Sequence, residues 1–207
     1  MKFYQEKIYH VYNQGNNHQK IFYERKNYLF FLNKMRIHLC KHCNILSWCL
    51  MPNHFHWMIQ VHPGYDENME NHSTDANAPK IDPLNRSISV LLSSYTKAIN
   101  RMYGRSGSLF RSRSKSIDLS PDDCIDNQHP LICFLYIHQN PLKANLVDKF
   151  EDWEFSSYRD YAGLREGTLC KINHTQNLLE LPSNHQDFTK LSYQTIPEHL
   201  LNSIFDS

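Results

Sequence analysis

A run of mostly apolar side chains predicts a short strand near the start of the chain. Residues 8–12 are β-branched or aromatic, and turn-forming residues follow at 13–17. Over residues 26–40 the apolar side chains recur every three or four positions, which indicates an amphipathic helix. Two further strands are predicted at about 45–50 and 54–61, joined tightly through residues 51–53.

Hydrophobic periodicity is lost after the strand predicted at 54–61 and returns in a later helix. Residues 63–83 are rich in Gly, Pro, Asn, Asp and Glu without periodicity, so we expect a long exposed loop near residues 63–85. Helical periodicity over 88–102 predicts a helix that ends near Gly104. An extended segment at 109–119 is expected next.

A last predicted helix contains residues 134–138. It should end by about Asn140, because Pro141 follows. The resulting order, β-α-β-β-α-β-α, is typical of a ferredoxin-like arrangement, an α+β fold with helices packed on one face of an antiparallel sheet. Residues 171–207 are polar with scattered Leu and show no clear pattern.

Composition narrows the functional classes. The 207 residues carry 22 Lys and Arg against 21 Asp and Glu, which excludes a uniformly basic nucleic-acid coat. The 11 Phe, 12 Tyr and 3 Trp supply enough apolar area to disfavour a disordered chain. No apolar run is long enough to span a membrane, and the first residues lack a secretory signal, so we expect a cytoplasmic protein with cysteine thiols and no membrane partner.

A histidine pair is the sharpest local signal for chemistry. On the strand predicted at 54–61, His54 and His56 share one face, and Phe55 and Trp57 share the other. Two imidazoles side by side suit one divalent cation bound through neutral nitrogens. The alternative is that both histidines simply lie on a solvent-facing strand, which is commoner for an isolated His-x-His motif.

The last predicted helix offers partners for that pair. Tyr136 and Asn140 are four residues apart and share a helix face, so the tyrosine hydroxyl and a third ligand from Asn140 can approach the same metal. Gln139 is the alternative third ligand. Equally open is an arrangement in which Tyr136 packs in the core and Asn140 caps the helix.

A basic run is hidden by the overall neutrality of the chain. No Asp or Glu occurs between residues 97 and 117, and on an extended segment alternate cations would project from one face toward phosphates. The alternative is a solvated edge that discourages strand aggregation. The candidate DNA-binding residues are Lys97, Arg101, Arg105, Arg111, Arg113 and Lys115.

Four stretches, in order over about residues 7–162, together resemble a known family. They read YHVYNQGNN at 9–17, MPNHFH at 51–56, GSLFRSR at 107–113 and YIHQNPLKA at 136–144, and a weaker one reads WEFSSY at 153–158. The chain thereby resembles the HUH single-strand DNA transposases with one catalytic tyrosine, especially the REP-associated tyrosine transposases, which belong to the IS200-like transposases.

The resemblance implies a role for each candidate residue. His54 and His56 would be the paired ligands of a weakly bound Mg or Mn ion, Asn140 the third ligand and Tyr136 the nucleophile. It also implies an RRM-like sheet with the His pair on a central strand. The transposase domain would span residues 1–162, and residues 163–207, which have no counterpart in the family, would form an extension of unknown role.

The implied activity is cleavage and rejoining of single-stranded DNA at hairpin repeats through a 5′-phosphotyrosine, by a monomer or a homodimer. A mild departure is Asn145, where relatives often have Gly, although Asn tolerates the left-handed conformation. Two alternatives stay open. One is a domesticated DNA-binding module without catalysis, and the other is a metal nuclease in which water attacks and Tyr136 only positions the substrate.

Overall fold

The computed structural model describes residues 1–66, 81–120 and 128–205. The predicted loop near 63–85 lies largely outside these residues. The elements, in chain order, are β1 (Ile8–Gln14), η1 (Asn16–His18), α1 (Arg25–Leu39), β2 (Cys43–Met51), β3 (His54–Val61), α2 (Pro83–Met102), β4 (Lys115–Asp118), α3 (Gln128–Lys143), η2 (Phe150–Asp152), α4 (Tyr158–Tyr161), α5 (Ile172–Leu179), α6 (His185–Ser192) and α7 (Glu198–Phe205).

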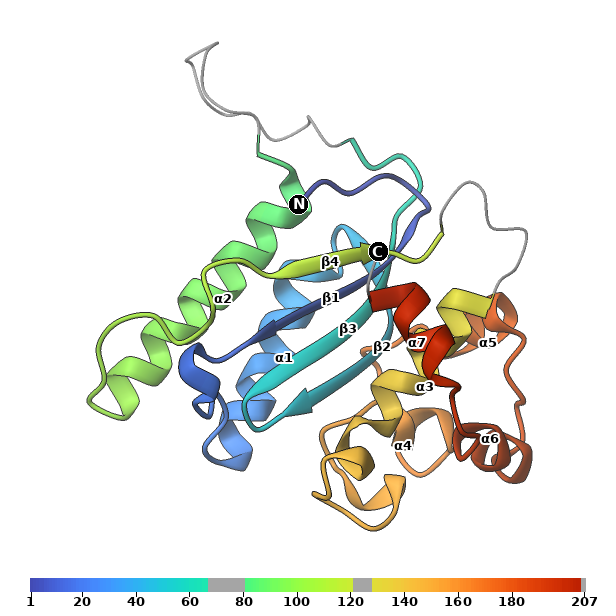
Figure 1. Cartoon of the computed structure of the whole chain (residues 1–207). Helices are drawn as coiled ribbons and strands as arrows, with labels where there is room; N and C mark the ends of the chain where they lie inside the picture. Colours follow the sequence, from blue (N-terminus) through green and yellow to red (C-terminus); the bar gives the residue numbers. More distant parts are fainter. Residues whose placement is uncertain (67–80, 121–127, 206–207) are drawn as a thin grey trace.

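The four strands form one antiparallel sheet in the order β2-β3-β1-β4 (Figure 1). The predicted α+β fold is therefore confirmed, and β3 and β1 occupy the two central positions. The register places Tyr12 of β1 opposite both His56 of β3 and Lys115 of β4. Since directly opposed residues share a face of the sheet, these three side chains lie on the same face.

Helices α1 and α2 cover the opposite face. Phe31 of α1 lies with its ring centroid 5.4 Å from that of Phe55 and 5.8 Å from that of Trp57, and all three side chains are fully buried. Tyr95 of α2 packs edge-on against Phe31 at 4.8 Å. Each buried aromatic contributes about 1.5–3 kcal/mol of transfer free energy, so this layer fixes which face of β3 remains for the histidines.

Helix α3 lies on the histidine side of the sheet, against β2 and β3, so helices cover both faces of the sheet, whereas the sequence predicted them on one face only (Figure 1). It runs through Pro141 to Lys143, so the prediction that it ends by Asn140 was wrong. Proline removes one donor without stopping the helix, and the next turn still forms because the Ala144 N–H donates to the Asn140 carbonyl at 2.9 Å.

The end of α3 explains the residue after Ala144. Asn145 has φ +53°, and its N–H donates to the Leu142 carbonyl while the N–H of Leu146 donates to the Pro141 carbonyl. These two bonds form a Schellman motif, which needs a left-handed residue at this position. The expectation that Asn145 tolerates this conformation is confirmed.

The C-terminal residues pack onto the same core. Phe188 of α6 is fully buried, and its ring lies 6.3 Å from that of Phe134 on α3. The Gln139 side chain on α3 donates from Nε2 to the carbonyls of Ser192 and Gln194, at 3.0 and 2.9 Å. Within the described residues, no helix is both long and apolar enough to cross a membrane.

Candidate active site

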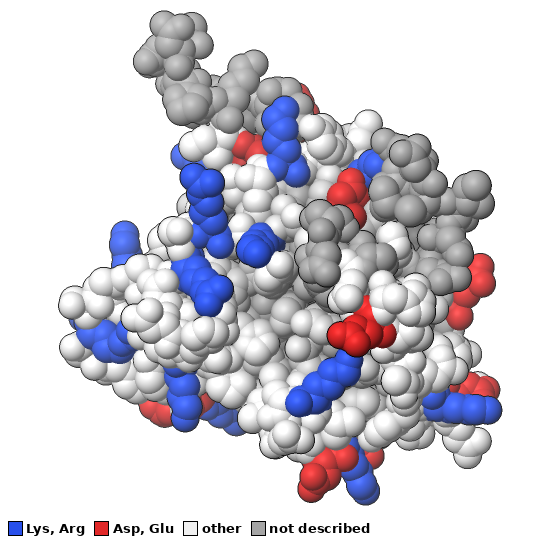
Figure 2. All heavy atoms as spheres, in the orientation of Figure 1, with Lys and Arg blue, Asp and Glu red and all other residues white. Residues whose placement is uncertain are grey.

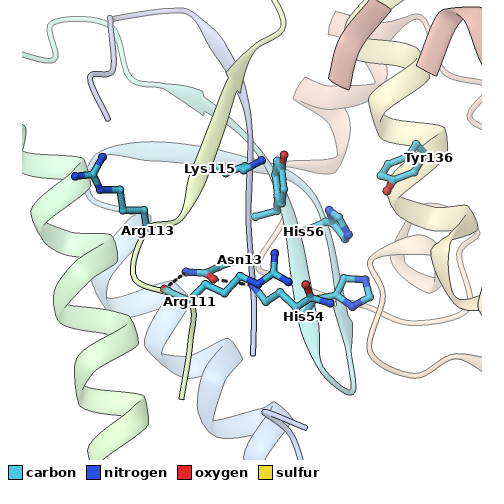
Figure 3. A pocket seen from close by; sticks show the side chains of 9 residues that line it. Asn13, His54, His56, Arg111, Arg113, Lys115 and Tyr136 are labelled. Carbon is cyan, nitrogen blue, oxygen red and sulfur yellow. Dashed lines mark hydrogen bonds between the residues drawn. The ribbon is translucent and has the colours of Figure 1, made fainter. Parts of the chain in front are cut away.

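A cavity of about 260 Å³ opens on the histidine face of the sheet (Figure 3). Three separate parts of the chain supply its walls, namely β1 with β3, the segment leading into β4, and α3. None of the lining residues in the described part of the chain is acidic. They are Tyr12, Asn13, Gln14, His54, His56, Arg111, Arg113, Lys115 and Tyr136.

The structure thus brings both predicted histidines to one site. Their ring centroids are 5.0 Å apart, with the ring planes nearly perpendicular. Nδ1 of His54 lies 2.7 Å from Oδ1 of Asn53, and Nδ1 of His56 lies 2.9 Å from Nε2 of His10. An amide oxygen only accepts, so His54 carries its proton on Nδ1 and keeps the lone pair on Nε2.

Burial keeps both imidazoles uncharged at neutral pH. Desolvation lowers the pKa of His54 to about 4 and holds the pKa of His56 well below its usual 6.5. The neighbouring histidines depress the pKa of His56 further. Neutral imidazole is the form that binds metal ions, so the pair has the protonation state that a cation requires.

Tyr136 reaches the cavity from α3. Its ring centroid is 5.5 Å from that of His56, with the rings perpendicular, and Nζ of Lys143 lies 5.6 Å from the tyrosine ring centroid. Burial raises the pKa of Tyr136 above its usual 10, a shift that the nearby Asn140 amide opposes. The phenol is therefore protonated at neutral pH and must lose its proton in any reaction in which it attacks.

The two predicted third ligands have different surroundings. Asn140 is absent from the cavity lining, and its Nδ2 donates to the Tyr136 carbonyl at 2.8 Å, so its role as a ligand stays a prediction. Gln139 is buried and held by residues 192 and 194, because the C-terminal segment covers its side of α3. That makes it unsuitable as the alternative ligand.

The donor set fits a weakly held divalent cation. Among the described residues there is no cluster of three or more His, Cys, Asp or Glu side chains that could hold a metal ion. The two imidazoles suit Mn²⁺ better than Mg²⁺, which prefers oxygen, and further ligands would have to come from phosphate oxygens or water.

Three of the six predicted basic residues line the cavity, namely Arg111, Arg113 and Lys115. Figure 2 shows Lys and Arg side chains gathered around the hollowed middle of this face. Lys115 belongs to β4, but residues 111–114 precede it and are not strand, so the extended segment predicted at 109–119 is only partly a strand.

The side chain of Asn13, which is 5% exposed, holds this irregular segment. Its Nδ2 donates to the Arg111 carbonyl at 3.2 Å, and its Oδ1 accepts from the Gln14 N–H (Figure 3). The same Nδ2 donates to Oγ of Ser114 at 3.0 Å. Asn13 therefore connects the central strand β1 to the segment that carries the two arginines.

The other three predicted basic residues do not line the cavity. Lys97 and Arg101 are exposed on α2, and Arg105 donates to Oε1 of Gln19. Conversely, Tyr12, Asn13 and Gln14 line the cavity although no local motif marked them as site residues. The alternation of the first predicted strand was the available signal for Tyr12, since it places positions 10, 12 and 14 on one face.

No protein-family profile matches the chain, and no curated protein matches it. Among solved structures, the fold is similar to that of a REP-associated tyrosine transposase bound to a REP hairpin. The superposition has a TM-score of 0.56 at 15% sequence identity and covers 80% of this chain and 85% of that one. The chain thus shares the fold of that transposase.

Proposed function

We propose that the chain is a single-strand DNA transposase or endonuclease in which Tyr136 cleaves the DNA backbone. The observation that carries the proposal is the convergence on one cavity of His54, His56, Tyr136 and three cations. These groups come from β3, α3 and the segment at β4, which are far apart in sequence.

The cations supply the binding of the phosphate backbone. Arg111, Arg113 and Lys115 line the cavity, and no described residue of its wall is acidic, so their charge is available to phosphate oxygens. A single strand is the proposed substrate because the chain resembles the single-strand DNA transposases in its motifs. The fold relative was solved with a REP hairpin, and we extend that substrate class to this chain.

In the proposed step, Oη of Tyr136 attacks a phosphorus atom of the strand. The new O–P bond forms as the bond from phosphorus to the 3′-oxygen breaks, which leaves a 5′-phosphotyrosine and a free 3′-hydroxyl. The phenol loses its proton to solvent, and the departing 3′-oxygen takes one from solvent. A Mn or Mg ion on His54 and His56, with Asn140 as the proposed third ligand, would stabilise the charge that develops on the phosphoryl oxygens.

Rejoining is the same step in reverse. Because the phosphotyrosine conserves the energy of the broken phosphodiester, a 3′-hydroxyl can attack it and restore a DNA strand. The chain needs no other energy source for a cut-and-rejoin cycle.

The test is covalent trapping of the strand. The protein is incubated with Mn²⁺ and labelled single-stranded hairpin oligonucleotides, including REP-type hairpins, and run on a denaturing protein gel. We expect a labelled band at protein mass that is absent with Tyr136→Phe and with His56→Ala. Tyr12→Phe is the matched control, because it removes the other tyrosine hydroxyl of the cavity and should still give the adduct.

The other outcomes are informative. Free cleavage products that persist in Tyr136→Phe would identify a nuclease in which water attacks. Hairpin binding with neither adduct nor cleavage would identify a binding module, and either result would refute the tyrosine mechanism.

A further inference from the structure

His10 of β1 is a histidine that the proposed chemistry leaves without a role. It is fully buried, and its Nε2 lies 2.9 Å from Nδ1 of His56. The two rings are stacked, with centroids 5.1 Å apart and planes inclined by 15°. The hydrogen bond therefore joins the two central strands of the sheet through their side chains.

Two proton arrangements satisfy this hydrogen bond, with opposite chemical consequences. If His10 donates, then neutral His56 carries its own proton on Nε2 and has no lone pair to offer there. If His56 donates from Nδ1, its Nε2 keeps the lone pair, and His10 carries its proton on Nδ1. Only the second arrangement makes His56 a metal ligand through Nε2.

The other histidine of the pair already has this arrangement. Oδ1 of Asn53 accepts from Nδ1 of His54, which leaves Nε2 of His54 unprotonated. Each imidazole ligand needs only its coordinating nitrogen unprotonated, and an acceptor at Nδ1 of His56, like the one at Nδ1 of His54, leaves Nε2 as that nitrogen. Outer acceptors of this kind hold the tautomer and the ring orientation of metal-binding histidines.

The stacking of Tyr12 restricts the rings further. Its ring lies 4.9 Å from that of His10 and 5.7 Å from that of His56, inclined by 22° and 28°. A ring flip of either histidine would break the 2.9 Å hydrogen bond inside this stack. The geometry therefore restrains both rings at the orientation in which Nδ1 of His56 faces His10.

We propose that His10 is a positioning residue that accepts the Nδ1 proton of His56 and keeps the Nε2 lone pair of His56 available to a cation in the cavity. The inference rests on the proposed function only in the identity of the ligand as a divalent cation. The protonation pattern itself belongs to the metal-free protein and can be measured there.

The first measurement reads the protonation pattern directly. Long-range ¹H–¹⁵N correlation spectra of the ¹⁵N-labelled chain, without metal, distinguish the two neutral forms of each histidine. We expect both His54 and His56 to carry the proton on Nδ1. A wild-type His56 protonated on Nε2 overturns the inference, whatever the chain does with DNA.

Variants of His10 give the second measurement. His10→Gln places an amide oxygen about where Nε2 lies and can still accept the proton, whereas His10→Leu cannot. We expect His10→Leu to weaken Mn²⁺ binding, followed by electron paramagnetic resonance, by about 10- to 100-fold. His10→Gln should restore most of the affinity, and the His56 spectrum of His10→Leu should change.

Val11→Ala is the matched control. Val11 is fully buried on the same strand but on the opposite face, so the variant loses packing without touching the histidines. It should bind Mn²⁺ like the wild type. Wild-type affinity in His10→Leu overturns the inference. A wild type with the expected protonation that binds no Mn²⁺ supports the role of His10 and refutes the metal of the proposed function.

Discussion

Replacement of Asn13 by Ala should weaken binding of single-stranded hairpin DNA without removing any charge. The Asn13 amide makes three hydrogen bonds, two to the segment at 111–114 and one to the Gln14 N–H. At about 0.5–1.5 kcal/mol for each bond, and with water replacing part of them at this exposed segment, we expect unfolding to be easier by about 1–3 kcal/mol.

The loss of DNA affinity follows because the segment at 111–114 is less ordered without the Asn13 contacts. Fixing the backbone of one residue costs about 1–2 kcal/mol in conformational entropy. Without the Asn13 contacts, the segment that carries Arg111 and Arg113 has to be ordered when DNA binds. If binding then bears the cost of ordering one residue, the affinity for the hairpin falls about 5- to 30-fold.

The assay is fluorescence anisotropy of a labelled hairpin over a range of salt concentrations. Asn13→Asp should weaken binding at least as much as Asn13→Ala, because a carboxylate cannot donate to the Arg111 carbonyl and adds a negative charge to the wall of the cavity. Ser114→Ala, which removes one bond only, should have a smaller effect. Wild-type affinity in both Asn13 variants would refute the reasoning.

Three further results are expected. Arg111→Ala should lower the salt dependence of hairpin binding by about one counterion, whereas Asn13→Ala should leave that slope unchanged; equal slopes in both variants would contradict this. Burial lowers the pKa of His10 and of His138 to about 3, whereas both would titrate near 6.5 in the unfolded chain, so unfolding takes up protons below pH 6.5. The free energy of unfolding should therefore fall by about 2 kcal/mol for each of these two histidines from pH 7 to pH 5. Urea unfolding at the two pH values measures this, and the same midpoint at both would contradict it. Gln139→Leu leaves the carbonyls of residues 192 and 194 without their amide donor, so limited proteolysis should cut the C-terminal helices sooner than in wild type; an unchanged pattern would show that α6 and α7 are held by other contacts.

The sequence was most informative where a pattern was local. The strand predicted at 54–61 has the bounds of β3, because alternation with period 2 and a tight turn both act on neighbouring residues. The same alternation correctly placed His54 and His56 on one face and Phe55 and Trp57 on the other. The sequence also placed Tyr136 on a helix. The structure confirms this, because Tyr136 lies on α3 and lines the cavity.

Features that depend on distant partners could not be predicted in this way. The carbonyl that Asn13 binds lies on Arg111, almost a hundred residues later, and no local rule connects the two. Gln139 was a possible ligand because it is three residues from Tyr136 on the helix, and the polar C-terminal sequence gave no sign that it would cover that side of α3. The rule for proline failed at Pro141 because tertiary packing and the Schellman motif at Asn145 support the last turn.

The most direct test of the central claim is to identify the atom that carries the DNA. The covalent product is digested with trypsin and nuclease, and the peptides that carry a nucleotide are sequenced by mass spectrometry. We predict a single nucleotide-bearing peptide, modified at Tyr136 through its 5′-phosphate. Modification at Tyr12, the other tyrosine of the cavity, or a 3′-phosphate linkage, would contradict the proposed mechanism.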